Sequence, residues 1–263
     1  MRAALVTEYR KAVTTRLWWV LLAAMAVYMA FLAAVLGWSF TQSPNPGSAP
    51  MTPHDVVQSV YTVGSSLGYV FPLVIGAITM SSEFRHMTVT PTFLAEPRRT
   101  VFLLGKLAAG LVLGVAFGVV GTVASAGAGA AVLAALGKPT LFGEASTWRT
   151  LGLSVVALTL WALIGVGLGT VLTNQVAVVV VALAWTQFVE PVLRIALGAT
   201  SWGAGIVQYL PGAASDALTG GSFYSQIGES QLLDWWAGLL VLLGYVAVLA
   251  VVGRLTTLRR DVT

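Results

Sequence analysis

Charged side chains able to do chemistry are concentrated in one short stretch, residues 81–106. It reads SSEFRHMTVTPTFLAEPRRTVFLLGK and holds two acids, three arginines, one histidine and one lysine, although only 9% of the 263 residues are charged. An ordinary soluble domain is about 25% charged. A chain so poor in charge therefore has a local concentration of ionic groups that needs an explanation.

Motifs for hydrolytic chemistry are missing. Glycine precedes lysine twice, but neither pair has the upstream glycine or the following Ser/Thr of a phosphate loop. The sequence contains no H-E-x-x-H and no cysteine. Its two histidines, His54 and His86, fall on opposite sides of the membrane in the topology derived below, so they cannot share a metal. We therefore expect no enzyme, no catalytic residue, and no metal or cofactor bound by this chain.

The elements that must position the charged stretch are long apolar segments. The chain is 57% hydrophobic, with a mean hydropathy of +0.85, which is more apolar surface than a soluble domain can bury. Six runs are long enough to cross a hydrocarbon core of about 30 Å as helices. They are residues 17–40, 56–80, 101–136, 151–172, 176–197 and 232–252. We expect an all-α integral membrane protein with six transmembrane helices, forming one transmembrane domain over residues 1–263.

Basic residues predict the orientation. Eleven of the 14 lysines and arginines lie in the N-terminal segment, the charged stretch and the C-terminal segment. Because an excess of Lys and Arg marks the cytoplasmic side, both termini and the charged stretch are expected in the cytoplasm. This placement accounts for the net charge of +4, so we expect the lipid bilayer, and no nucleic acid, as a partner.

Two segments differ from plain spans. Leu5, Tyr9 and Val13 recur every four residues, which predicts an amphipathic helix over residues 1–15 on the inner membrane surface. A plain basic anchor for the first span is the compatible alternative. Residues 190–232 contain two prolines and several glycines, which predict broken, re-entrant helices folded against the outer membrane face.

Polar side chains inside the spans form candidate stripes. In the second span Gln58, Thr62, Ser65 and Tyr69 recur on one helix face, and Gln187 lies near the outer end of the fifth. Such stripes could line a path for a polar or amphipathic substrate. The alternative is that they hold neighbouring helices together.

One ion pair is predicted near the outer end of the fifth span. A carboxylate such as Glu190 is costly in an apolar helix unless it is solvated or paired. Arg194 follows four residues later and offers that pair. The pair is either part of an outer gate or a cap on an interfacial turn.

The charged stretch predicts a short hairpin. Thr90 can cap a helix that begins at Pro91, and Pro97 ends it. Little more than one turn fits between the prolines, with Phe93 and Leu94 as apolar side chains facing the cytosol. A solvated cytoplasmic loop does not require this geometry, whereas a docking surface for a cytosolic partner does.

This stretch resembles the first cytoplasmic loop of permease subunits of the type-2 ABC exporters, actinobacterial members in particular. That loop runs E-[FY]-R, T-[VI], an apolar pair, P-x-R or P-R-R, and a lysine about seven residues later. The matching residues are Glu83-Phe84-Arg85, Thr88-Val89, Phe93-Leu94, Pro97-Arg98-Arg99 and Lys106. The likeness extends to TNQVA at residues 173–177, FVEP at 188–191 and YLPGAA at 209–214. Many members have arginine where this chain has Thr173.

The resemblance implies a permease of the bacterial plasma membrane that forms the substrate path as a dimer with a second permease copy. Two copies of a separate ATPase chain, which hold ATP and Mg, would supply the energy. Residues 81–100 would be the coupling hairpin seated in an ATPase cleft, with Glu190 and Arg194 near the outer gate. Phe93 and Leu94 would fill the cleft, and the coupling set would be Glu83, Arg85, Thr88, Phe93, Leu94, Pro97, Arg98 and Arg99, with Glu83 and the arginines at the rim.

The alternative function is a secondary transporter or channel. Ion-coupled carriers usually place acids near the middle of the membrane and are built from inverted repeats. Neither feature is evident in this sequence. Family members that resemble the chain export drugs, lipids, glycans or peptides, and no residue here selects among them.

Overall fold

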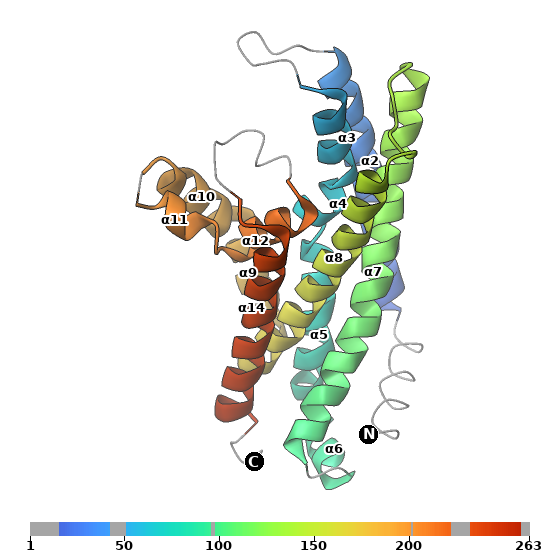
Figure 1. Ribbon diagram of the computed structural model, residues 1–263. Helices are drawn as coiled ribbons and strands as arrows, with labels where there is room; N and C mark the ends of the chain where they lie inside the picture. Colours follow the sequence, from blue (N-terminus) through green and yellow to red (C-terminus); the bar gives the residue numbers. More distant parts are fainter. Residues whose placement is uncertain (1–15, 43–50, 96–97, 201, 222–231, 259–263) are drawn as a thin grey trace.

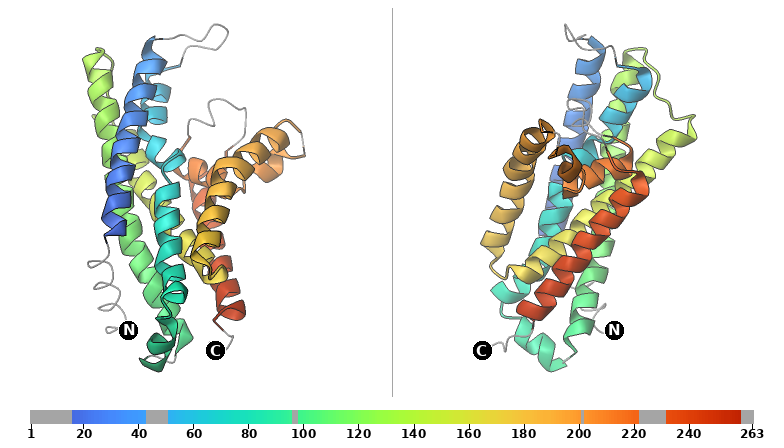
Figure 2. Two further views of the ribbon diagram at one scale, coloured as in Figure 1. Left: turned by 180° about the vertical axis from the view of Figure 1, so that it is seen from behind. Right: turned by 60° about the vertical axis from the view of Figure 1, so that its left-hand side comes forward.

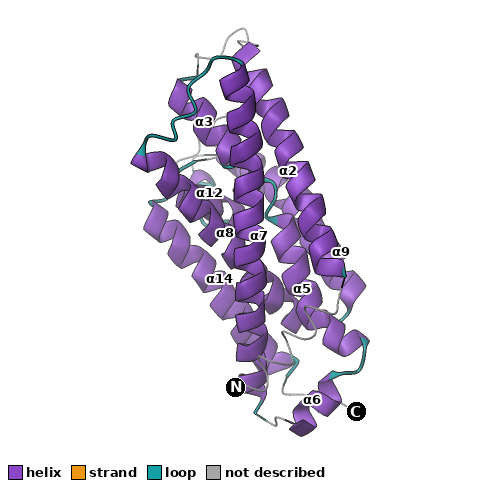
Figure 3. Ribbon diagram, turned by 90° about the vertical axis from the view of Figure 1, so that its right-hand side faces the viewer, coloured by secondary structure: helices purple, strands orange, loops and turns teal. Residues whose placement is uncertain are grey.

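The computed structural model describes residues 16–42, 51–95, 98–200, 202–221 and 232–258, and all regular structure in these ranges is helical (Figure 3). Five helices are long and apolar enough to cross a membrane. They are α2 (Leu17–Gln42), α7 (Arg99–Ala135), α8 (Ala145–Val171), the continuous run Gln175–Gly198 and α14 (Trp235–Thr256). The prediction of an all-α chain with helices of membrane-spanning length is confirmed for these ranges. Residues 1–15, where an interfacial helix was predicted, Pro97 and residues 222–231 lie outside them.

The second predicted span is not one continuous helix, so the described chain has five candidate spans rather than six. It is divided into α3 (Pro53–Tyr61), α4 (Val63–Ser66) and α5 (Val70–Arg85). A capping box starts α3: Asp55 N donates to Thr52 Oγ1 at 3.2 Å, and the Asp55 carboxylate accepts from Thr52 N at 3.0 Å. The breaks fall in the sequence TVGSSLGY, whose glycines and serines are weaker helix formers than alanine.

One end of the molecule carries the charged hairpin. Figure 1 places α6 (Val89–Ala95) at the lower end, close to the end of α14, while the loop between α7 and α8 lies at the upper end. The hairpin therefore lies at the same end as the last described residues of the chain, as the basic pattern requires.

The core is built around α8, which packs against α5, α7 and α14 (Figure 2). Trp161 of α8 is 1% exposed and stacks on Tyr69, with ring centroids 4.3 Å apart. The contact between α5 and α8 depends on glycine. A Cβ on Gly165 would overlap the carbonyl oxygen of Leu73, and one on Gly76 would overlap that of Ala162. Glycine lets these backbones meet directly, as small residues do in membrane helix pairs.

The fifth span bends away from the bundle and leads into short helices. Asn174 caps α9 (Gln175–Ala184), which continues through a π-helical turn, η1 (Trp185–Val189), into α10 (Glu190–Gly198). The wider turn lies directly before Pro191, whose missing N–H and bulky ring disturb regular α-helical bonding. Two short helices follow, α11 (Ala204–Val207) and α12 (Pro211–Thr219), and α12 returns to pack on α14.

Candidate functional site

The hairpin is anchored by a buried ion pair. Lys106 Nζ of α7 lies 2.5 Å from Glu83 Oε1 of α5, and the two side chains are 1% and 2% exposed. Lys106 Nζ also donates to the carbonyl oxygen of Thr79 at 3.2 Å and lies over the ring of Phe102. Glu83 therefore lies inside the hairpin, not at its rim as expected, because it pairs with a lysine 23 residues away.

The turn that leads into α6 is fixed by the same carboxylate. Thr88 Oγ1 donates to Glu83 Oε2, and Thr88 N donates to Glu83 O at 2.9 Å. Between them Met87 adopts a φ of 53° and is 82% exposed. A non-glycine residue with positive φ is uncommon and costs energy, so the surrounding contacts hold this turn in place.

The two expected apolar anchors of α6 have different environments. Leu94 is 83% exposed. Phe93 is only partly exposed, because its ring packs edge-on against Phe102, with centroids 5.2 Å apart, and beneath the Arg99 guanidinium. Phe93 thus holds α6 against α7, and the apolar side chains presented outward are Leu94 and Met87.

The arginines of the hairpin connect it to other helices. Arg85 Nη1 donates to Gln175 Oε1 at the start of α9, at 3.1 Å. Arg99 Nη1 donates to the carbonyl oxygen of Leu258, which follows α14 and is 1% exposed. Arg98 is exposed at the start of α7. The hairpin is therefore tied to both α9 and the end of α14.

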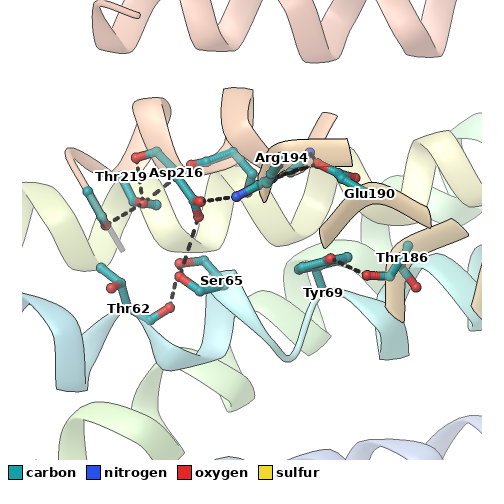
Figure 4. Close-up of polar contacts among 12 residues, drawn as sticks. Thr62, Ser65, Tyr69, Thr186, Glu190, Arg194, Asp216 and Thr219 are labelled. Carbon is teal, nitrogen blue, oxygen red and sulfur yellow. Dashed lines mark hydrogen bonds and ion pairs between the residues drawn. The ribbon is translucent and has the colours of Figure 1, made fainter. Parts of the chain in front are cut away.

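A second site joins α10 to α12 in the interior (Figure 4). Arg194 Nη2 lies 3.0 Å from Glu190 Oε1, as the sequence predicted, and its Nη1 lies 2.7 Å from Asp216 Oδ2. Gly212 N at the start of α12 donates to the same Glu190 oxygen at 2.6 Å. We call Glu190, Arg194 and Asp216 the α10–α12 charge cluster.

The polar stripe of the second span lies beside this cluster and is mostly buried. Figure 4 shows Thr62, Ser65 and Tyr69 along the interrupted segment. The Thr62 and Ser65 hydroxyls donate to backbone oxygens of their own segment, and Tyr69 OH donates to Thr186 O at 3.2 Å. Gln58 Nε2 reaches Thr219 O at 3.4 Å. The Tyr69 and Gln58 contacts join helices within one chain, as the alternative reading of the stripe proposed.

A small cavity lies beside the stripe, among the residues that the structure describes. Gln58 borders a cavity of about 10 Å³, which is room for about one water molecule. Gln187 is exposed on the π-helical turn, where its Nε2 lies 3.4 Å from Thr186 Oγ1. The assignment of Gln58, Thr62, Ser65, Tyr69 and Gln187 to a substrate path therefore stays a prediction.

Sequence reasoning missed two members of these sites. Asp216 lies 22 residues beyond Arg194, so no helical spacing connects them. Lys106 was recognised in the loop pattern, but its pairing with Glu83 was not. Both were visible as ionic residues in apolar segments, which is the signal that could have found them. Among the described residues, no three of His, Asp and Glu converge to hold a metal ion.

Comparison with known proteins does not extend this description. No family model matches the chain, and no curated protein matches it. The described residues therefore define the class of protein: a helical protein with five apolar helices of membrane-spanning length.

Proposed function

We propose that the chain is the permease subunit of an ATP-driven ABC exporter in a bacterial plasma membrane. A dimer of permeases would form the substrate path, and a separate ATPase chain, present in two copies with ATP and Mg, would drive it. The resemblance of residues 83–106 to the coupling loop of type-2 exporters supports this proposal, as does the fold of that loop.

The observation that carries the proposal is the hairpin of α5, α6 and α7. Its base is fixed by Glu83, Lys106 and Thr88, while Leu94 and Met87 stand out from the tip. A rigid base with protruding apolar side chains at one end of the molecule is what docking into an apolar cleft requires, because central apolar anchors carry most of an interface's energy.

We further propose that the hairpin end faces the cytoplasm, together with both termini. The described basic residues at that end include Arg85, Arg98, Arg99, Lys106 and Arg254. Lys138, Arg149 and Arg194 are the described basic residues toward the opposite end. The positive-inside rule then assigns the hairpin to the cytoplasm. In this orientation α10, α11 and α12 form the outer gate region.

A secondary transporter is the second candidate, and one observation favours it. Glu190 and Asp216 are 1% and 3% exposed and share one arginine, so the interior does contain acids of the kind that ion-coupled carriers use. No inverted repeat supports that reading. The two candidates differ in their need for an ATPase chain.

The experiment that separates them is purification with a candidate ATPase. The chain should be coexpressed with a candidate ATPase that carries a phosphate loop, chosen from the products of neighbouring genes, and purified through a tag on the permease. We expect equal numbers of the two chains and Mg-dependent ATP hydrolysis by the complex. A permease that purifies alone, and moves solutes across vesicles without nucleotide, would contradict the exporter and support the carrier.

A further inference from the structure

The α10–α12 charge cluster is buried and contains two acidic side chains but one basic side chain. Two carboxylates, Glu190 and Asp216, share the single guanidinium of Arg194. The side chain of Glu190 is 1% exposed, that of Asp216 4% and that of Arg194 14%. If both acids were ionised, two carboxylates would share the one guanidinium that the described residues supply, away from water, and burying the second negative charge is costly.

The hydrogen bonds of Glu190 are unevenly divided between its two oxygens. Oε1 accepts three, from Arg194 Nε at 3.2 Å, Arg194 Nη2 at 3.0 Å and Gly212 N at 2.6 Å. Oε2 is buried and receives none from the described residues. A protonated carboxyl has this pattern, because its carbonyl oxygen accepts hydrogen bonds while its hydroxyl oxygen carries the proton.

Among the residues that the structure describes, the groups shown around Glu190 include one cation, Arg194. From α12 it meets the Gly212 amide and Asp216, whose Oδ1 lies 3.5 Å from Ser66 Oγ of α4. From α14, Tyr245 is close enough to interact with the Glu190 charge, and its hydroxyl donates to Tyr209 O at 3.2 Å. Among the described residues that face Glu190, Arg194 is therefore the source of positive charge.

We propose that Glu190 is a proton-binding site, with the proton on Oε2. Binding forms one O–H bond as hydronium from bulk water returns to water, and release gives the proton back to water. With the proton bound, the cluster is neutral and joins α10 to α12. Without it, the extra negative charge favours separation of the two helices, so the site couples pH to the packing of α10 against α12. This inference needs no ATPase and stands apart from the proposed function.

The test is infrared spectroscopy of the purified full chain in lipid nanodiscs. A protonated carboxyl has a C=O stretch that is resolved from those of carboxylates and amides. At pH 7, where an ordinary glutamate with a pKa of about 4.3 is ionised, we expect this band in the wild-type protein. Glu190→Gln should remove it. Glu144→Gln, which changes an exposed acid in the loop before α8, should leave it intact.

A second variant keeps the test decisive if Glu190→Gln disturbs folding. Asp216→Asn leaves Glu190 alone with Arg194, so the pair is neutral without a proton, and the band should disappear at pH 7. No band in the wild-type protein at pH 7 would overturn the proposal. A band that survives Glu190→Gln but is lost in Asp216→Asn would also overturn it, because the proton would then belong to Asp216.

Discussion

Lys106→Met is expected to lower the free energy of unfolding by about 3–5 kcal/mol, because it takes the ammonium partner of a buried ion pair away from the Glu83 carboxylate. Glu83 is 2% exposed, so water cannot replace the lost ammonium group. The Thr88 hydroxyl alone would remain as a side-chain partner among the contacts shown for its carboxylate. The measurement is the fraction of protein that stays monodisperse after heating in detergent.

The matched control for this prediction is the double variant Glu83→Gln/Lys106→Met. It removes both charges and keeps similar volumes, and replacing a buried pair by neutral groups is often close to neutral for stability. We expect it to recover most of the stability that Lys106→Met loses. If Lys106→Met and the wild-type protein lose monodispersity at the same temperature, the ion pair does not hold the hairpin base.

Gly165→Ala is expected to destabilise the chain by about 3 kcal/mol, the upper part of the range for overpacking a close-packed core. The new Cβ would overlap the carbonyl oxygen of Leu73 and lie 2.9 Å from Ala77 N. Both neighbours are backbone atoms of α5, so no side-chain rotation relieves the overlap, and α5 must move away from α8.

Gly152→Ala on the same helix is the matched control. A Cβ on Gly152 meets nothing within 4 Å, and the residue is exposed. Since alanine favours helix over glycine by about 1 kcal/mol, this variant should be neutral or slightly more stable. Thermal melting of both variants in one detergent makes the comparison. Equal stability of Gly165→Ala and Gly152→Ala would show that α5 and α8 do not meet at Gly165.

The features that sequence could predict are those fixed by local spacing. The long helices α2, α7, α8 and α14 begin and end close to the predicted apolar runs. The Glu190–Arg194 pair is present because residues four apart meet on a helix. Hydropathy and helical periodicity determine both, and neither depends on distant parts of the chain.

The features that sequence missed depend on tertiary contacts. The apolar run of residues 56–80 predicted one span, yet the chain breaks at Thr62 and before Val70, where its polar groups contact α12 and the π-helical turn. Phe93 was expected at the docking surface, but its ring packs edge-on against Phe102 of α7 and is only partly exposed. In both cases the deciding partner lies in a helix that local periodicity does not identify.

The central claim is that α6 docks on an ATPase, and the most direct test is retention of that ATPase by Leu94→Asp. Leu94 is 83% exposed, so the change should leave the permease folded. Burying a leucine contributes about 1.5–3 kcal/mol, which corresponds to about tenfold or more in affinity. The aspartate would also place an unpaired charge in the cleft. Gly143→Asp adds the same charge to an exposed loop at the opposite end. The account predicts that Gly143→Asp copurifies with the ATPase and Leu94→Asp does not; equal retention by both variants would contradict it.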